Sequence, residues 1–402
     1  MSIGEPLIIE DFFKPATWEN PYLAYTAWRE QSPLIARMPL VLPDGSEVES
    51  FSWLLLRHQE VYSVLRDHET FSSDPPELPG RPAPGLPLIQ DDPPRHTVLR
   101  RLVNKAFTAR RIAQLEPWIR QNAEELIGAM GEGEADVIAG LAVPLPVKVI
   151  ARLLGIPGED YLAFKRWSVM FLSMNTRDLE PGSRLSNVME MAAYFGRIAA
   201  ERRAEGAEDL ITALVEAELD GERLQDDELL GFCILLLIAG NETTTNLIGN
   251  MLNLLAARPE LWRRVRENRS LVEPTIEEVL RYESPVQTLF RFVRRDTDIG
   301  GRKILQNTSV VVSFGAANRD PAVFPNAEQF NVERDWTSHL AFGAGIHYCL
   351  GAPLARVEAA VALNAMLDRY ETITSGSRPG TRQRATNLVF GFSQLPLRVG
   401  RG

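Results

Sequence analysis

The stretch His339-Leu-Ala-Phe-Gly-Ala-Gly-Ile-His-Tyr-Cys-Leu-Gly-Ala-Pro-Leu-Ala-Arg356 crowds glycines and an aromatic residue around one thiol, Cys349. Glycines let a backbone turn tightly and approach a flat surface closely. Apolar spacing predicts a helix over Leu350–Leu367, directly behind the thiol. A helix N-terminus and exposed loop N–H groups stabilise a thiolate, the form that binds a metal. No second Cys or His stands at zinc-ligand spacing, which excludes a structural zinc site.

The other cysteine, Cys233, lies inside the apolar run 229–239. We expect Cys233 to be buried as a small hydrophobe, which is the commonest role of a lone cysteine. On composition alone, the same role is the competing interpretation of Cys349. Two cysteines cannot build a disulfide framework, and both suit a reducing compartment.

Charge and hydropathy exclude several classes of partner. The 402 residues carry a net charge of −10, which argues against nucleic acid or an anionic membrane as the main partner. The first ten residues lack the basic and long apolar regions of a signal peptide. The most apolar run, Leu229 to Gly240, is shorter than the roughly 20 residues of a membrane span. We therefore expect a cytoplasmic protein.

The rest of the chain reads as helical, with few strands. Helical spacing of apolar residues occurs in five segments, Ala106–Met130, Val147–Leu154, Val188–Arg203, Leu210–Leu219 and Leu350–Leu367. Strand-like composition occurs in three, Ser52–Leu56, Ile304–Phe314 and Leu388–Phe392. This pattern predicts a mainly α fold with small β-sheets, and it lacks the strand–helix alternation of a doubly wound protein.

A proline-rich segment, Ser72–Arg95, interrupts the helical pattern. Its eight prolines between Pro75 and Pro94 prevent both a helix and a central strand. Because it also carries apolar residues, including Leu78, a substrate-facing loop is favoured over a domain linker, which stays open.

The spacing Phe-Gly-x-Gly-x-His-x-Cys-x-Gly, from Phe342 to Gly351, resembles the haem-ligand loop of cytochromes P450. The resemblance implies the triangular P450 fold, as a single domain over residues 1–402. It also implies that Cys349 ligates the iron of haem b, with Phe342, Gly343 and Gly351 against the cofactor. Thiolate ligation pushes electron density onto iron and favours O–O cleavage.

A polar segment, Ala239-Gly-Asn-Glu-Thr-Thr-Thr245, breaks the centre of a long apolar helix expected over Leu229–Leu255, with Asp226 and Asp227 at its N-cap. On pattern alone, a polar patch at the surface explains it equally well. Beside the cysteine loop it resembles the P450 oxygen-binding segment. The resemblance implies that Ala239 and Gly240 lie against the cofactor, that Thr243 hydrogen-bonds at the oxygen site, and that Glu242 passes protons inward.

Two further pairs carry the resemblance. Glu278 and Arg281 share a helix face and resemble the family's Glu-x-x-Arg pair, which Arg334 is expected to join, although Val332 replaces the usual proline. These three residues are expected to be architectural.

The second pair, His96 and Arg100, shares a face of a helix opened by prolines, which by itself indicates only a solvated side. The resemblance implies that both bind haem propionates, together with Arg291 and His347.

The resemblance also implies a substrate pocket whose members are apolar apart from Thr243. They are Leu86, Leu88, Ile89, Leu235, Ala239, Thr243, Val286, Leu289, Val389 and Phe390, each of which has a place in the core as its alternative. Such a pocket suits a small apolar substrate: a terpenoid, steroid, fatty acid or polyketide-like molecule.

The implied activity is O2-dependent hydroxylation or epoxidation. No flavin or iron–sulfur segment follows Gly402, so we expect electrons from NAD(P)H through a ferredoxin reductase and a ferredoxin, docking near Arg101, Lys105, Arg110 and Arg111. The alternatives are a peroxide-driven haem-thiolate enzyme and a haem-thiolate protein that oxidises nothing. The Glu242–Thr243 pair favours the monooxygenase.

Overall fold

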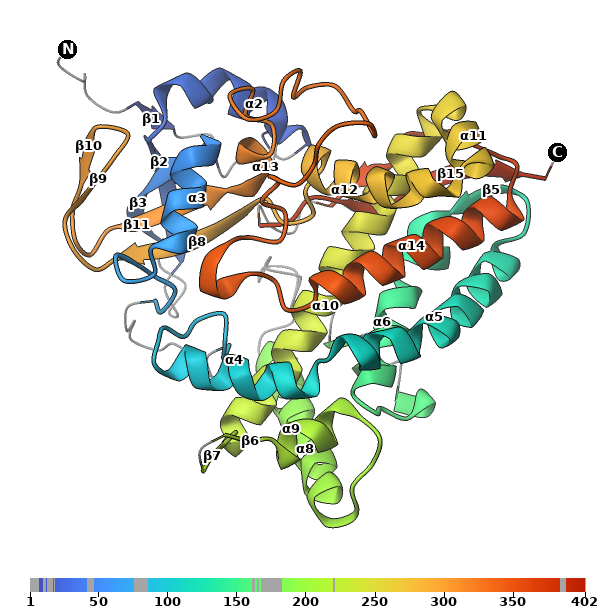
Figure 1. Ribbon diagram of the computed structural model, residues 1–402, viewed down its shortest axis with the longest axis horizontal. Helices are drawn as coiled ribbons and strands as arrows, with labels where there is room; N and C mark the ends of the chain where they lie inside the picture. The colour runs from blue at the N-terminus through green and yellow to red at the C-terminus, as the bar shows by residue number, and fades with distance from the viewer. Residues whose placement is uncertain are drawn as a thin grey trace.

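The computed structural model describes residues 7–9, 12, 17, 19–41, 47–75, 86–160, 163–164, 166–167, 183–219, 221–383 and 388–401. Within these residues the α-helices are α2 (Pro21–Trp28), α3 (His58–Arg66), α4 (Arg95–Ala106), α5 (Ala109–Met130), α6 (Pro144–Leu153), α8 (Ser183–Glu205), α9 (Leu210–Glu216), α10 (Asp226–Ala256), α11 (Pro259–Glu267), α12 (Val272–Tyr282), α13 (Phe314–Ala317) and α14 (Ala352–Arg369). Helices dominate, as the apolar spacing predicts, and the large sheet lies on one side of the molecule while β5 (Gly133–Asp136) and β15 (Pro396–Gly400) lie on the opposite side (Figure 1).

The strands form one large sheet and several small ones. They are β1 (Ile8–Ile9), β2 (Leu34–Val41), β3 (Glu47–Leu55), β4 (Phe71–Ser72), β5 (Gly133–Asp136), β6 (Glu218–Leu219), β7 (Glu222–Arg223), β8 (Thr288–Val293), β9 (Thr297–Ile299), β10 (Arg302–Ile304), β11 (Ser309–Ser313), β12 (Thr372–Ser375), β13 (Thr381–Arg382), β14 (Phe392–Gln394) and β15 (Pro396–Gly400). The six-stranded sheet has the order β1-β2-β3-β11-β8-β4, and a three-stranded sheet has the order β12-β15-β5.

Side chains of β11 pack alternately on the two faces of the large sheet. Val310 and Val312 pack in the cluster that includes Val61 and Leu65 of α3. Val311, between them, packs on the opposite side in the cluster that includes Tyr25 of α2. Successive side chains of a strand point to opposite faces, so the sheet is buried between helices. Figure 1 shows α3 lying across this sheet.

The largest core cluster surrounds α10 and joins it to α5, α6, α12 and α14. Within the described residues, α10 is the one helix whose length and apolar content would suffice to cross a membrane. Its most apolar window is 61% buried inside the protein, the position of a core helix. Figure 1 shows α10 running obliquely through the helical part, with α14 passing across it.

Several predicted boundaries are wrong for local reasons. The segment Ala106–Met130 breaks at Thr108, whose hydroxyl caps α5 by accepting a hydrogen bond from the N–H of Arg111. The segment Leu210–Leu219 stops at Glu216, and its last residues form the β6–β7 hairpin. The N-cap of α10 is Gln225, in a capping box with Glu228, so Asp226 and Asp227 lie in the first turn instead.

Two predicted strands are also divided. Ile304–Phe314 contains the end of β10, a turn with Asn307 at φ 64°, and then β11. Leu388–Phe392 forms only a bridge between Val389 and Val286 before β14 begins at Phe392. Gly391 approaches α10 so closely that a Cβ there would lie 1.9 Å from Oδ1 of Asn246. Because contact with α10 determines the chain's path here, a regular strand cannot continue through it.

The proline-rich segment lies partly outside the described residues, including Leu78 and the rest of 76–85. Its described end, residues 86–91, is a turn held by its own side chains. The N–H of Leu86 donates to Gln90 Oε1 at 2.9 Å, and the N–H of Leu88 donates to Asp91 Oδ2 at 2.6 Å. This turn leads directly into α4.

Candidate active site

The cysteine loop is a tight turn in front of α14. Gly343 and Gly345 have φ values of +74° and +71°, a region that favours glycine. A Cβ at Gly345 would lie 2.4 Å from the carbonyl oxygen of Leu65, so α3 and the loop meet at a point where only hydrogen fits. The N–H of Cys349 donates to the carbonyl of Phe342 at 2.9 Å, which closes the turn. Cys349 therefore lies shortly before α14, which begins at Ala352.

The Cys349 thiol sits between opposing influences. Burial raises its pKa, while hydrogen bonds from the N–H groups of Gly351 and Ala352 and the charge of Arg100 favour the thiolate. Burial, and to a lesser extent the charge of Asp209, raises the pKa of Cys233 to about 12. Cys233 therefore behaves as a buried hydrophobe, and Cys349 has the helix N-terminus and cation that a metal-binding thiolate needs.

On α10 the polar segment stays helical. The hydroxyl of Thr243 donates to the carbonyl oxygen of Ala239 at 2.6 Å, one turn back. Ala239 is exposed and Leu235 and Thr243 are half-buried, although most of α10 beyond the segment is buried. These residues, spaced four apart, present one accessible face at the centre of a core helix. In this rotamer the hydrogen of the Thr243 hydroxyl is engaged, and its oxygen keeps its capacity to accept a hydrogen bond.

Gly240 points elsewhere. A Cβ at this position would lie 2.6 Å from Cδ1 of Ile150 on α6, so the glycine permits close packing of α6 on α10. The predicted contact of Gly240 with a cofactor could therefore involve only its backbone. The packing of α6 on α10 already explains why a glycine stands at this position.

Glu242 is half-buried beside two amides. Burial raises its pKa, and the side chains of Asn246 and Gln383 lower it less strongly. Nδ2 of Asn246 donates to Oε1 of Glu242 at 3.4 Å. A carboxyl whose pKa lies above its usual range exchanges a proton more readily near neutral pH. This chemistry suits a proton carrier.

The four predicted propionate ligands come together from distant parts of the chain. The His96 and His347 ring centroids are 4.5 Å apart, and Nη2 of Arg100 donates to the carbonyl of Tyr348 at 2.8 Å. Burial, and then the charges of Arg291, His96 and Arg100, lower the pKa of His347 to about 3. Burial lowers the pKa of Arg291 to about 10. The shift of His347 records the cost of placing basic groups together in a buried site, and that of Arg291 records the cost of burying a charge.

This cluster has the donor set that a haem needs. Nε2 of His96 is buried without a hydrogen-bond partner in the described part of the chain. The arginine that approaches the carboxylates of Asp74 and Asp92 is Arg294, whereas Nη1 of Arg291 donates to the carbonyl of Phe290. Buried donors of this kind call for an anion with several oxygens, and propionate carboxylates supply it. The residues present therefore fit a haem, with Cys349 for the iron and the cationic cluster for the propionates.

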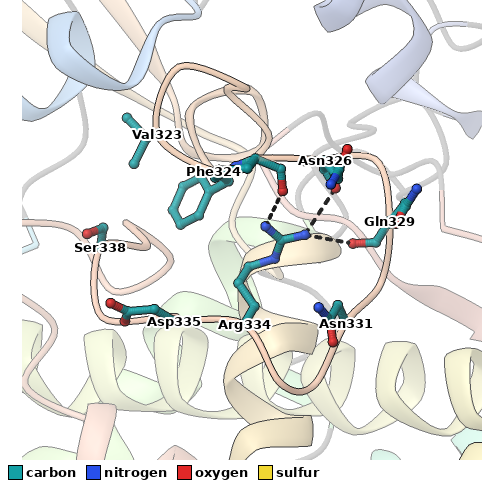
Figure 2. Close-up of a pocket in the computed structure, with 9 residues that line it drawn as sticks. Val323, Phe324, Asn326, Gln329, Asn331, Arg334, Asp335 and Ser338 are labelled. Carbon is teal, nitrogen blue, oxygen red and sulfur yellow. Dashed lines mark hydrogen bonds between the residues drawn. The ribbon is translucent and has the colours of Figure 1, made fainter.

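Glu278 and Arg281 form a fully buried ion pair, with both side chains at 0% exposure and Nε to Oε2 at 2.7 Å. Arg334 approaches the same carboxylate at 3.5 Å. Figure 2 shows the Arg334 guanidinium pointing at backbone carbonyls of the loop around it, including that of Asn326 at 3.0 Å. The pocket of about 390 Å³ drawn there is lined by this loop. Its arginine is already engaged, so the pocket belongs to the architecture.

The predicted pocket residues differ in how deeply they are buried and in what they contact. Leu86, Leu235, Val286, Leu289 and Val389 are half-buried, Ile89 is 36% exposed, and Leu88 is buried with φ +71°. Phe390 lies instead in a core cluster, its ring 5.6 Å from that of Tyr22 and 4.0 Å from the guanidinium of Arg382. Those contacts account for its burial without any substrate.

Sequence reasoning missed one polar centre beside the cysteine loop. The carboxylate of Glu277 accepts hydrogen bonds from His339 and Arg356, the residues at the two ends of the quoted stretch. Burial opposes ionisation, but these hydrogen bonds outweigh it and lower the pKa of Glu277 to about 2. The only sequence signal was a second acidic residue next to Glu278.

Comparison with known proteins agrees with this geometry. The family model described as Cytochrome P450 matches residues 147–399. The cytochrome P450 monooxygenase PikC of Streptomyces venezuelae is 37% identical over 394 residues, 95% of this chain and 92% of that protein.

Two solved structures share the fold. The cytochrome P450 CYP109Q5 from Chondromyces apiculatus is 39% identical with a TM-score of 0.86, covering 98% of this chain and 99% of that one. CYP109E1 from Bacillus megaterium in complex with corticosterone is 37% identical with a TM-score of 0.83, covering 94% and 98%. The mainly α P450 fold predicted from the sequence is thereby confirmed. The chain belongs to the cytochrome P450 family, whose members use haem and O2, and it is a monooxygenase of that family.

Proposed function

We propose that residues 1–402 act as one haem b-thiolate domain that inserts an oxygen atom from O2 into an apolar, steroid-sized substrate. The observation that supports this most directly is the buried cationic cluster next to the thiol. Arg100 lies close enough to Cys349 for its charge to favour the thiolate, and it shares the cluster with His96, Arg291 and His347. A thiolate next to a cluster of two arginines and two histidines is what an iron porphyrin with two propionates requires.

The chain contributes binding, orientation and proton handling. Bound haem supplies the redox chemistry with O2, which thiolate ligation favours. His96 Nε2 and the Arg291 guanidinium hold the propionates, and Arg100 stabilises the charge on Cys349. Glu242, whose pKa is raised by burial, would take up and release protons at the centre of α10, and the hydroxyl of the adjacent Thr243 would offer a hydrogen bond on the accessible face of that helix.

A steroid-like substrate is the class we favour among the four that an apolar pocket suits. Leu235, one turn before Ala239 on α10, is a half-buried apolar side chain, as are Val286 and Leu289. CYP109E1, one of the structural neighbours, was solved with corticosterone. Rigid apolar rings bury a large area at little entropic cost in such a pocket.

For electrons we propose NAD(P)H, a ferredoxin reductase and a ferredoxin with an acidic surface. Arg101, Lys105 and Arg110 are exposed on α4 and α5. Arg111 is half-buried and donates to the carbonyls of Ala106 and Asp209, so it contributes less than the sequence predicts. Association through such a patch weakens as salt rises. Both cysteines are free, which suits the reducing cytoplasm we propose as its location.

A ligand panel tests the substrate class. Steroids, macrolides, terpenoids and fatty acids of similar size are titrated into the haem-loaded protein, and the low-to-high-spin Soret shift is recorded. We expect the tightest saturable shifts from steroids, and product formation with a generic ferredoxin and its reductase. Stronger binding of a fatty acid or macrolide would replace the proposed class. Faster product formation with peroxide than with the redox partners would favour the peroxide-driven alternative.

A further inference from the structure

One buried carboxylate connects the two ends of the cysteine loop. Glu277, on α12, is 0% exposed. Its Oε2 lies 2.8 Å from Nε2 of His339, before the loop, and its two oxygens accept from Nε and Nη2 of Arg356, in α14, at 2.6 and 3.0 Å. Cys349 lies between these two anchor points in the sequence. The Glu277 side chain thus holds both the start of the loop, at His339, and the helix that follows it, at Arg356.

Hydrogen bonds on both ring nitrogens orient His339. Its Nδ1 accepts a hydrogen bond from the N–H of Ala341 at 3.2 Å, and its Nε2 faces Glu277. The bidentate partner Arg356 supplies a positive charge that balances the carboxylate.

The same residues reach the thiol through the loop itself. The guanidinium of Arg356 lies 4.5 Å from the ring centroid of Phe342, and the carbonyl of Phe342 accepts the N–H of Cys349 at 2.9 Å. On the His339 side, the N–H of Leu340 donates to Oδ1 of Asn318 at 2.6 Å. Each end of the loop is consequently tied to the protein body, and Glu277 is the group that both ends share.

The neighbouring carboxylate, that of Glu278, makes no hydrogen bond or ion pair with the cysteine loop among the described residues. Among the described residues, Glu278 binds Arg281, Arg334 and the N–H of Asn331, all outside the segment 339–356. The two glutamates therefore differ in which part of the molecule they hold, although they are adjacent in α12.

We propose that Glu277 is a positioning residue for Cys349: it holds the cysteine loop in the conformation that receives haem. This inference rests on the proposed haem-thiolate function. It requires no contact between Glu277 and the cofactor, because the effect passes through His339 on one side and through Arg356 and Phe342 on the other.

The test compares Glu277→Gln with two controls. Glu273→Gln makes the same change at an exposed position of α12, and Val265→Ala lowers stability through a buried residue of α11. Three readouts are taken: amide hydrogen exchange of residues 339–351 in the haem-free protein, transfer of haem to excess apomyoglobin, and the thiolate fraction in the reduced carbonyl spectrum. Arg356→Lys and His339→Gln repeat the measurements if Glu277→Gln does not fold.

We expect Glu277→Gln to speed both loop exchange and haem loss on the order of tenfold, equivalent to about 1.4 kcal/mol, and to lower the thiolate fraction. Both controls should leave these values at wild-type level, even where Val265→Ala lowers the Tm. Loop exchange and haem loss within twofold of wild type would overturn the proposal, as would equal changes in Val265→Ala. If the wild-type protein itself forms no thiolate complex, the proposed function fails, while the haem-free exchange still reports whether Glu277 holds the loop.

Discussion

The cysteine loop and the central face of α10 present their functional groups in different ways. Cys349 receives hydrogen bonds from two N–H groups, and its loop is closed by the bond to Phe342 and anchored at Glu277. Thr243 has one hydrogen bond, to a carbonyl of its own helix, and the adjoining Ala239 is exposed. The thiol side is thus built before any ligand arrives, whereas the α10 side keeps polar atoms available. Metal affinity should depend on the first region and proton delivery on the second.

The largest effect on stability is expected at the buried ion pair of α12, next to Glu277 in the sequence but without contact to the cysteine loop. Glu278→Ala leaves the guanidinium of Arg281 charged and fully buried, since its carboxylate partner is lost. Removing one member of a buried pair costs about 3–5 kcal/mol. Chemical denaturation followed by far-UV circular dichroism should show that loss. A cost below about 1 kcal/mol would mean that the carbonyls around Arg281 suffice to hold it.

A selective change on the α10 side should spare haem binding. Thr243→Ala removes the hydroxyl but keeps the helix, so haem content and the Tm should stay close to wild type. General acid–base groups contribute about 10²–10⁴-fold, and we expect at least tenfold lower product per NAD(P)H, with hydrogen peroxide released instead. Product and peroxide are quantified in the same reaction. A wild-type ratio of product to NAD(P)H in this variant would show that Thr243 takes no part in proton delivery. The control is Thr244→Ser, at a buried neighbouring position.

Acid should weaken the anchor of the cysteine loop. The folded-state pKa of Glu277 is about 2, below the roughly 4.3 of an unfolded glutamate. Its stabilisation is therefore fully present above the unfolded pKa and is lost as pH falls through the folded pKa. The corresponding contribution is at most about 3 kcal/mol. We expect the difference in Tm between wild type and Glu277→Gln to be constant from pH 7 to 5 and to shrink from pH 4.5 toward 2.5. A difference that does not change over that window would contradict an ionised Glu277.

The smallest effect is expected at the surface. Exchanging Arg101 and Arg110 for glutamate changes two exposed charges and leaves the buried cluster intact. First reduction by an acidic ferredoxin should slow several-fold at low ionic strength and converge with wild type at high salt, because exposed charges are screened. Stopped-flow reduction at two salt concentrations measures this. Identical rates at low salt would place ferredoxin docking elsewhere.

The sequence predicts the helical fold and the cysteine loop well, because these depend on residues close together in the chain. The spacing around Cys349 and the apolar run of α10 are local signals. The large sheet was mostly missed, since β11 pairs with β3 across more than half of the chain and no local pattern reports such pairing. The same reason applies to Glu277, whose partners at 339 and 356 are brought to it only by the fold.

Resemblance supplied what local patterns could not. His96 and Arg291 are separated by nearly half of the chain, and only the family motif indicated a shared site. The resemblance did not foresee that Gly240 faces Ile150, or that Phe390 packs between Tyr22 and Arg382. These placements follow from how tightly particular helices and loops pack, which depends on side chains from several elements at once.

The central claim is that Cys349 holds the haem iron as a thiolate, and the reduced carbonyl spectrum measures this directly. The purified, haem-loaded protein is reduced with dithionite, exposed to carbon monoxide, and compared with Cys349→Ala and Cys233→Ala. We predict the Soret position of thiolate ligation for the wild type and for Cys233→Ala, and its complete loss in Cys349→Ala. A histidine-type carbonyl spectrum in the wild type, or an unchanged spectrum in Cys349→Ala, would contradict the account.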